Sequence, residues 1–369
     1  MAFPTGWNRK CALTIDHTKV SADQANFPVL FTVSNLPSEM FDADGSYPAN
    51  ADGGDIRFSS DSAGATELPV EVVSFTRNND PALGKAEVHV KVTSVSSTVD
   101  TVVYVWYNNS SATMPARTNT YGSDNVWDSN FKFVSHQGAS IGDSTSAAVA
   151  GTNHSTAEDA TTTLIGISSR KYVSASSQYI DYGNICNING DVDITLESVH
   201  NHASLSVTVW QWYLGRGDNQ YNLKKRDGVD WIPNPQGHAL GLYDTGWVDT
   251  YAVTTPSATG TWYHFTGRRT ASNNTNEIFV DGVKDTVHTS TSTTIANSAD
   301  SLWTGGRSGS NDKFLDGWLE EIRISDLARA DSWVSSTYNT INSPSTFVTE
   351  GTPESLSTNI TSMRVIWFS

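Results

Sequence analysis

Carboxylates and a guanidinium crowd one short stretch near the C-terminal end of the sequence. The stretch "FLDGWLEEIRISDLARADSW", residues 314–333, has the pattern of a strand followed by a helix and carries Glu320, Glu321 and Arg323. Carboxylates in such a place are acids of an active site, ligands of a metal, or solvent-exposed residues on one face of a strand. Adjacent strand residues point to opposite faces, so Glu320 and Glu321 cannot flank one substrate as a pair.

The same alternation predicts different surroundings for these side chains. Glu320 shares its face with an apolar row: Trp318, Ile322 and Ile324. A carboxylate in such a row needs a buried partner, so we expect Arg or Ca²⁺ beside Glu320. Glu321 and Arg323 are expected to face water.

Recognised catalytic motifs are absent from the sequence. It contains no Gly-x-Ser-x-Gly and no His-Glu-x-x-His, and its nine histidines are scattered. The stretch Asp191 to Glu197 holds the nearest set of acids, but its alternation predicts a half-wet strand with Ile194 and Leu196 on the apolar face. We therefore expect a protein that is not an enzyme.

Composition indicates an all-β surface and excludes two classes of partner. Only 17% of residues are charged, against roughly 25% in an average globular chain. The 23 basic and 39 acidic residues give a net charge of −16, which should repel phosphate backbones, so no nucleic acid is expected. No apolar run approaches the length of a membrane span, so no membrane insertion is expected.

The cysteines and the first residues of the sequence indicate the cellular compartment in which the protein is made. Two isolated thiols, Cys11 and Cys186, are the favoured interpretation, with a single bridge between them left open. The opening "MAFPTGWNRK" carries no apolar signal segment. We expect a protein made in the host cytoplasm that does not leave by a secretory signal.

Strand signals dominate, and length predicts two domains. Apolar or alternating runs rich in β-branched and aromatic residues are bounded by Gly, Pro, Asn or Asp throughout the chain. We predict an all-β fold of two β-sandwiches: an N-terminal domain over 1–122, a second over 123–343, and a C-terminal tail or arm over 344–369. The first strands are expected at 10–16, 27–33, 54–60, 68–75, 85–92 and 100–108.

One helix and an apolar terminal strand close the chain. The stripe of Trp333, Val334, Thr337 and Tyr338 predicts a helix over 330–341, capped by Asp331 or Ser332. The last residues, "MRVIWFS", form an apolar β-like segment. It either closes an edge of one of the chain's own sheets or is an arm that adds a strand to a neighbouring subunit.

The quoted patterns also resemble known families. Residues 7–110, with "GDIRF", "TELPVEV", "VKV" and "YVWYNN" in this order, are similar to a bacterial and phage domain of unknown function that commonly precedes a laminin-G-like domain. Residues 126–341, with "SSQYIDYG", "GTWYHFTGRRT", "EIFVDGV" and "FLDGWLEEIRISDLARADSWVSSTYN", resemble the concanavalin A-like lectin/glucanase jelly roll. The resemblance implies two β-sandwiches, the second a laminin-G-like jelly roll with a short C-terminal helix.

The resemblance also implies binding functions, because members bind glycans or proteins and often hold a structural Ca²⁺. The enzymatic members carry Glu-x-Asp-x-x-Glu on one strand, a pattern that this chain lacks. The loop that is often Asp-rich in the family reads "SASSQYIDYG" here, with Ser where Asp would stand. The remaining candidates for a metal are Asp143, Asp181 and Glu320.

A carbohydrate site is predicted in the segment 210–247, because sugars stack their C–H faces on aromatic rings and bond their hydroxyl rims to polar groups. Trp210 and Trp212 are expected in the core. The candidate binding residues are Trp231, Tyr221, Trp247, Tyr243, Asp218, Asn219 and Asn222.

These features together predict a non-enzymatic phage virion protein, a capsid decoration or a tail or fibre component, with a glycan-binding jelly roll. Its expected partners are other virion proteins, copies of itself and a cell-surface glycan. The first alternative is a bacterial surface or secreted adhesin that binds carbohydrate, located outside the cell. The second is a glycoside hydrolase on the same fold.

Overall fold

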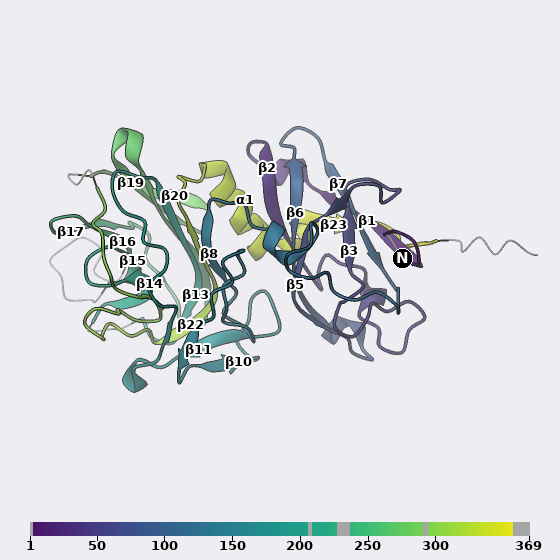
Figure 1. The fold of residues 1–369 in the computed structure, drawn as a ribbon, viewed down its shortest axis with the longest axis horizontal. Coiled ribbons are helices and arrows are strands. Elements are labelled where there is room, and N and C mark those ends of the chain that lie inside the picture. The colour runs from purple at the N-terminus through teal and green to yellow at the C-terminus, as the bar shows by residue number, and fades with distance from the viewer. Residues whose placement is uncertain (1–2, 206–208, 227–236, 291–293, 357–369) are drawn as a thin grey trace, which may run out of the picture.

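The computed structural model describes residues 3–205, 209–226, 237–290 and 294–356 of the chain. These residues form two lobes of antiparallel sheets that lie side by side, with helix α1 between them (Figure 1). The expected all-β class is confirmed. The limits 122 and 343 that we proposed for the second domain stay a prediction.

The first lobe packs two sheets face to face. One runs in the order β23-β1-β7-β3-β4, with β24 also on β1, and the other in the order β2-β6-β5. Its strands are β1 (Arg9–Ile15), β2 (Gln24–Thr32), β3 (Arg57–Ser59), β4 (Glu67–Leu68), β5 (Val70–Thr76), β6 (Lys85–Val95), β7 (Thr101–Tyr107), β23 (Val348–Glu350) and β24 (Glu354–Ser355).

The C-terminal segment returns to this first lobe. Strand β23 pairs with β1 through Ile15 and Val348, and β24 pairs with it through Arg9 and Ser355. Residues 348–355 therefore close an edge of a sheet in the first lobe. The terminal "MRVIWFS", for which both the edge strand and the arm were predicted, lies outside the described residues.

The second lobe also packs two sheets. The sheet that faces the first lobe, here called the inner sheet, runs β10-β11-β22-β13-β18-β19-β20, with β8 on β22; the far sheet, here the outer sheet, runs β17-β16-β15-β14-β21-β12-β9 (Figure 1). The inner strands are β8 (Phe131–Ser135), β10 (Ala157–Asp159), β11 (Ser169–Tyr172), β13 (Ile194–His202), β18 (Trp262–Thr270), β19 (Thr275–Val280), β20 (Val283–Thr289) and β22 (Gly317–Ser325). The outer strands are β9 (Thr152–His154), β12 (Tyr179–Asp181), β14 (Gln211–Arg216), β15 (Tyr221–Lys225), β16 (His238–Tyr243), β17 (Trp247–Tyr251) and β21 (Leu302–Thr304).

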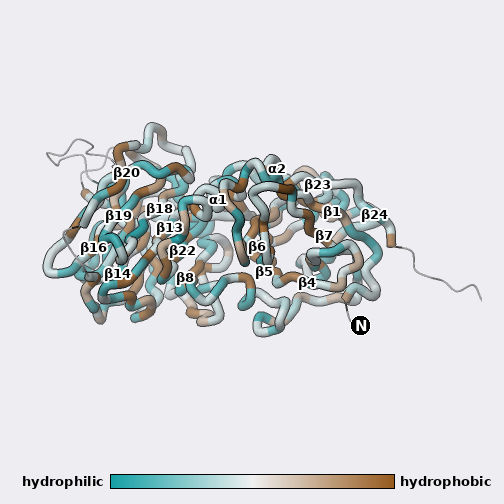
Figure 2. Tube along the Cα trace, turned by 90° about the horizontal axis from the view of Figure 1, so that it is seen from above, coloured by the Kyte–Doolittle hydropathy of each residue, from teal (hydrophilic) through white to brown (hydrophobic). Residues whose placement is uncertain are grey.

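Each lobe has its own apolar core, because alternate residues of facing strands point into the space between the sheets. Leu13 and Val90 belong to the core of the first lobe, and Leu196 and Leu223 to that of the second. Figure 2 shows the hydrophobic segments along the strands of both lobes and α1 between the lobes.

Helix α1 (Asp331–Asn342) joins the lobes. It confirms the helix expected over 330–341. Its N-cap is Ala330, so the prediction that Asp331 or Ser332 caps the helix is wrong. The helix packs on β2, and α2 (Pro344–Phe347) then leads the chain into β23. Short 3₁₀ turns occupy His17–Lys19, Ser38–Met40, Pro81–Leu83, Ser123–Asn125, Ser174–Ser176 and Ala271–Asn273.

Two simple expectations can be compared with this fold. Cys11 and Cys186 are both free thiols, as the favoured interpretation held. Among the described residues, no helix has the length and apolar character needed to cross a membrane.

Candidate functional site

Tryptophans gather on the side of the outer sheet that faces away from the core. A pocket of about 240 Å³ opens there, lined by Trp210, Trp212, Lys224, Trp247, Asp249, Arg307 and Lys313. Strand alternation explains the arrangement: Tyr221 and Leu223 of β15 point into the core, so Lys224, which follows Leu223, points outward.

The pocket is held in shape by one buried ion pair and by ring contacts. Lys224 Nζ donates to Asp249 Oδ1 at 2.7 Å and lies 3.8 Å from the centre of the Trp210 ring. Burial lowers the pKa of Lys224 to about 8, although Asp249 opposes this shift. Trp212 and Trp247 meet edge to face with ring centres 5.9 Å apart. A flat aromatic wall therefore stands next to fixed charged groups.

Aromatic rings continue across the same sheet beyond the pocket. Trp303 of β21 stacks on Tyr179 of β12 with centres 3.6 Å apart, and His154 of β9 stacks on the other side of Tyr179 at 4.1 Å. Arg307 follows β21, and its guanidinium carbon lies 5.8 Å from the centre of the Trp212 ring. We call the pocket together with Trp303, Tyr179 and His154 the aromatic face.

Three of the predicted sugar-binding residues lie at or beside this face. Trp247 lines the pocket, and Tyr243 meets its ring edge to face at 5.5 Å. Asn222 is buried on the same side of β15 as Lys224, close to Asp249 through the space that Gly241 leaves. Within the described chain, neither amide atom of Asn222 has a hydrogen-bond partner.

The other predicted sugar-binding residues do not line the pocket in the described part of the chain. Tyr221 is fully buried in the core and donates its hydroxyl proton to the carbonyl of Cys186 at 2.7 Å, so its placement at a binding surface is wrong. Asp218 and the exposed Asn219 belong to the turn between β14 and β15, where Asp218 lies 3.2 Å from Arg307. Trp231 lies outside the described residues.

Sequence reasoning missed Trp210 and Trp212, which we had expected in the core. Trp212 is only 2% exposed, yet it does not belong to the core. It is buried by Trp247 and Arg307 on the outward side of the sheet. The reason is structural: a bulge between Trp212 and Leu214 shifts the register of β14, so that both Tyr213 and Leu214 belong to the core. A pattern of strict alternation cannot show such a shift.

A larger pocket of about 590 Å³ opens at one edge of the second lobe. Its lining is mostly aliphatic, with Val149, Ile185 and Ile188 among the residues, and it holds no aromatic ring. The ion pair of Lys132 and Asp326 lines it, but it lacks the flat rings on which a sugar stacks.

The three metal candidates do not converge. Both oxygens of Asp143 accept hydrogen bonds, from Val134 N, Thr145 N and Thr145 Oγ1, and Asp181 accepts one from Gly183 N at 2.7 Å. Among the described residues, none of the groups whose ligand atoms lie within 4.8 Å of one another contains Asp143, Asp181 or Glu320. Calcium at these positions stays a prediction without geometric support.

Glu320 is buried, and its partners among the described residues are backbone N–H groups in place of the expected Arg. Its carboxylate accepts the backbone N–H groups of Leu164 at 2.7 Å, Ile165 at 2.7 Å and Gly166 at 3.0 Å. Such donors occupy the oxygens that a cation would need. Burial raises the pKa of Glu320 to about 8, against the effect of these three donors.

A β-bulge overturns the faces predicted for this strand. Val199 pairs with Glu321 and His200 with Leu319, so Glu320 is the extra residue on β22. Leu319, in place of Trp318, then joins Ile322 and Ile324 in the core.

The residues expected to face water are buried instead. Glu321 and Arg323 are each 2% exposed, and Glu197, assigned to a half-wet strand, lies 3.2 Å from His264. Their side of the inner sheet is covered by the first lobe, as the contact of His136 with Glu87 of β6 and with Glu321 shows.

Comparisons with known proteins bear on the second lobe. Residues 175–335 match the family described as the concanavalin A-like lectin/glucanases superfamily. No curated protein matches the chain. The segment matched is less than half of the chain.

Solved structures with some similarity include the following three. They are the binding domain of Paraclostridial Mosquitocidal Protein 1 (14% identity, TM-score 0.46, 57% of this chain and 52% of that chain), domain 4 of AbnA, an arabinanase from Geobacillus stearothermophilus, in complex with arabinotriose (17%, 0.44, 56% and 97%), and the CBM40 of a Ruminococcus gnavus sialidase bound to α2,3 sialyllactose (14%, 0.34, 40% and 82%). The chain spans about half the length of the first of these.

The antiparallel sheets of the second lobe, its single core and the short helix that follows β22 agree with the family match over the same residues. Residues 175–335 therefore form a domain of the concanavalin A-like lectin/glucanases superfamily.

Proposed function

We propose that this chain is a non-enzymatic protein that binds carbohydrate on the aromatic face of its outer sheet. The observation that carries the proposal is the pocket in which Trp210, Trp212 and Trp247 surround the Lys224 and Asp249 pair. Aromatic rings fit the C–H faces of sugars, and charged side chains held in place bond to hydroxyl groups.

The same pocket favours binding over hydrolysis. Glycoside hydrolysis uses two carboxylates about 5–9.5 Å apart, on either side of the bond that is cut. Among the residues that line the pocket, Asp249 is the sole carboxylate, and it is paired with Lys224. A superfamily that contains both lectins and glucanases leaves the choice to the site, and this site supports a lectin.

Trp247→Ala is the variant that tests the carbohydrate proposal. Removing a ring that stacks on a sugar should weaken binding at least about tenfold, which corresponds to roughly 1.4 kcal/mol. The measurement is a glycan array with the untagged full chain, followed by calorimetric titration of the best glycan into the parent and the variant.

Tyr47→Ala is the matched control, because Tyr47 is a large aromatic residue of the first lobe that is 40% exposed. It should bind as the parent does. A parent that binds no glycan on the array, or a Trp247→Ala variant of unchanged affinity, would refute the proposal. Release of reducing ends from the bound glycan, abolished by Asp249→Asn, would point to the hydrolase instead.

We further propose that the binding face is carried on a phage virion, as a capsid decoration or a tail or fibre component. The support is the similarity of residues 7–110 to a domain found in phage and bacterial proteins, together with the two free thiols. The competing proposal is a bacterial adhesin outside the cell. Antibody against the first lobe should label purified virions and leave intact bacterial cells unlabelled; labelling of cells alone would favour the adhesin.

The terminal arm is best tested by deleting residues 357–369, because β23 and β24 already belong to the first lobe through β1. If these residues add a strand to a neighbouring subunit, sedimentation of the full chain should show an assembly that the shortened chain no longer forms. If both chains sediment as monomers at micromolar concentration, the proposal that these residues form an arm is refuted.

A further inference from the structure

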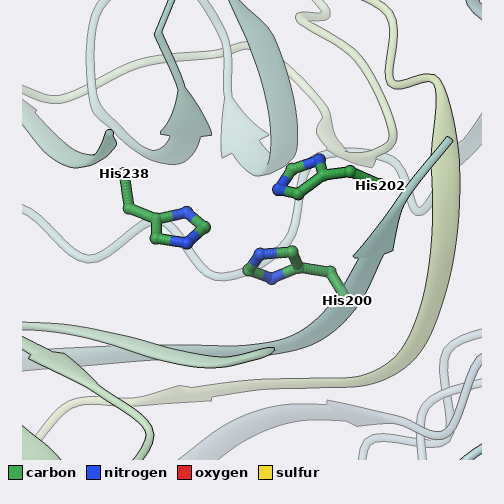
Figure 3. A group of neighbouring side chains, drawn as sticks. All are labelled: His200, His202 and His238. Atoms are coloured by element: carbon green, nitrogen blue, oxygen red, sulfur yellow. The ribbon is translucent and has the colours of Figure 1, made fainter. Parts of the chain in front are cut away.

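Three histidine side chains from two different sheets lie close together inside the second lobe. His200 and His202 lie on β13 of the inner sheet, and His238 lies on β16 of the outer sheet. One ring nitrogen of each lies within 4.8 Å of those of the other two, and Figure 3 shows the three rings turned toward one another. All three side chains are fully buried.

The position of the rings follows from the local structure. The bulge on β22 opposite Val199 and His200 keeps β13 paired while its alternate residues His200 and His202 point between the sheets. Tyr213 of β14 connects them, since its hydroxyl lies 3.2 Å from His202 Nε2 and 2.9 Å from His238 Nδ1. Its ring stacks on His200 with centres 3.9 Å apart.

Hydrogen bonds to the described residues do not satisfy every ring nitrogen of this cluster. Ser198 Oγ lies 3.1 Å from His200 Nδ1 and orients that ring. Within the part of the chain that the structure describes, His200 Nε2, His202 Nδ1 and His238 Nε2 have no partner. A buried polar nitrogen without a partner destabilises the fold, so three such nitrogens together indicate a ligand.

We propose that His200, His202 and His238 bind one Zn²⁺ ion that links the inner sheet to the outer sheet. Zinc takes imidazole nitrogens at about 2.0–2.1 Å in a tetrahedron, which places two ligand atoms about 3.4 Å apart. The ring nitrogens therefore need to approach one another by no more than about 1.4 Å from the 4.8 Å limit. The Tyr213 hydroxyl contacts His202 Nε2 and His238 Nδ1 and holds these two rings in place.

One charge near the rings opposes a cation. Lys225 of β15 pairs with His238 of β16, so both side chains lie on the same face of the outer sheet. The positive charge of Lys225 therefore weakens the binding of a metal ion here. Its ammonium donates to the carbonyls of Ser204 at 3.1 Å and Leu205 at 2.6 Å, which hold it in place.

The experiment uses the untagged full chain, because a histidine tag would itself bind zinc. The chain is expressed with added zinc, dialysed, and measured by plasma mass spectrometry, and about one zinc ion per chain is expected. Replacing zinc by Co²⁺ should produce the intense visible absorption of tetrahedral cobalt. Removing the metal with a chelator should lower the melting temperature, and adding zinc back should restore it.

Variants locate the ion. His200→Gln and His238→Gln should lose the metal and the cobalt spectrum, whereas His264→Gln, which changes another buried histidine of the inner sheet, should keep both. Lys225→Gln should bind zinc several-fold more tightly, a gain that misfolding cannot imitate. A parent without stoichiometric metal and without cobalt absorption would overturn the proposal, as would retention of zinc by His200→Gln.

Discussion

Replacing His136 by leucine is expected to lower the free energy of unfolding by about 3–5 kcal/mol, the usual cost of leaving buried charges without their partner. His136 is buried where the two lobes meet. Its Nδ1 lies 2.9 Å from Glu321 of the second lobe and 3.1 Å from Glu87 of the first, and its Nε2 lies 3.5 Å from Glu71. Urea denaturation followed by fluorescence measures the loss.

The pH dependence of this effect has a defined sign. Burial lowers the pKa of His136, but the carboxylates of Glu321, Glu71 and Glu87 together raise it well above its ordinary value of 6.5. A raised pKa means that the contribution of His136 is fully present below pH 6.5 and is lost as the pH rises through the folded-state value. The difference between the parent and His136→Leu should therefore shrink only in the alkaline range.

His17→Leu is the control for this prediction. His17 also meets a carboxylate, with its Nδ1 2.6 Å from Asp100, but that pair is exposed to solvent. Exposed pairs contribute little to stability, so this variant should unfold nearly as the parent does. Equal stability of His136→Leu and the parent at pH 6 would mean that the three carboxylates do not need the imidazolium.

Trp333→Ala is expected to cost a similar amount, about 3–5 kcal/mol, through loss of packing at the junction. Trp333 belongs to α1, which follows the second lobe, yet its ring packs in the core of the first lobe. It is 6% exposed, meets Phe27 of β2 edge to face at 4.9 Å, and lies under the Arg329 guanidinium at 4.4 Å. The free energy of unfolding in urea measures the loss.

Limited proteolysis adds a readout specific to the junction. If Trp333 holds the lobes together, the alanine variant should be cut between them under conditions in which the parent resists. Leu327→Ala, at a residue nearby that is 37% exposed, should behave as the parent. Cutting confined to loops within one lobe would show that Trp333 stabilises a core without joining the lobes.

Local sequence patterns determined the class of this protein and several of its elements. Alternating apolar runs predicted the strands of both lobes, and the apolar stripe from Trp333 predicted α1 to within one residue at each end. Trp247, predicted from its residue type as a sugar-binding residue, lines the pocket, and its role there stays a prediction. These features depend on neighbours along the chain, which a sequence shows directly.

Tertiary structure decided which polar residues are covered. Glu321 and Arg323 alternate with isoleucines as exposed residues do, and nothing near them in the sequence shows that the first lobe covers that side of the inner sheet. Trp212 was misplaced for the same reason, since strict alternation does not reveal a bulge. A change of register moves every later side chain of a strand to the other face.

Contacts between distant segments were also beyond local reasoning. The pairing of β23 with β1 and the meeting of His238 with His200 depend on how strands far apart in the chain are arranged into sheets. Residue type and spacing therefore determined the β-class and the helix. The arrangement of the sheets alone decided the aromatic face, the buried charges between the lobes and the three-histidine cluster, because each is built from side chains of several strands that only packing brings together.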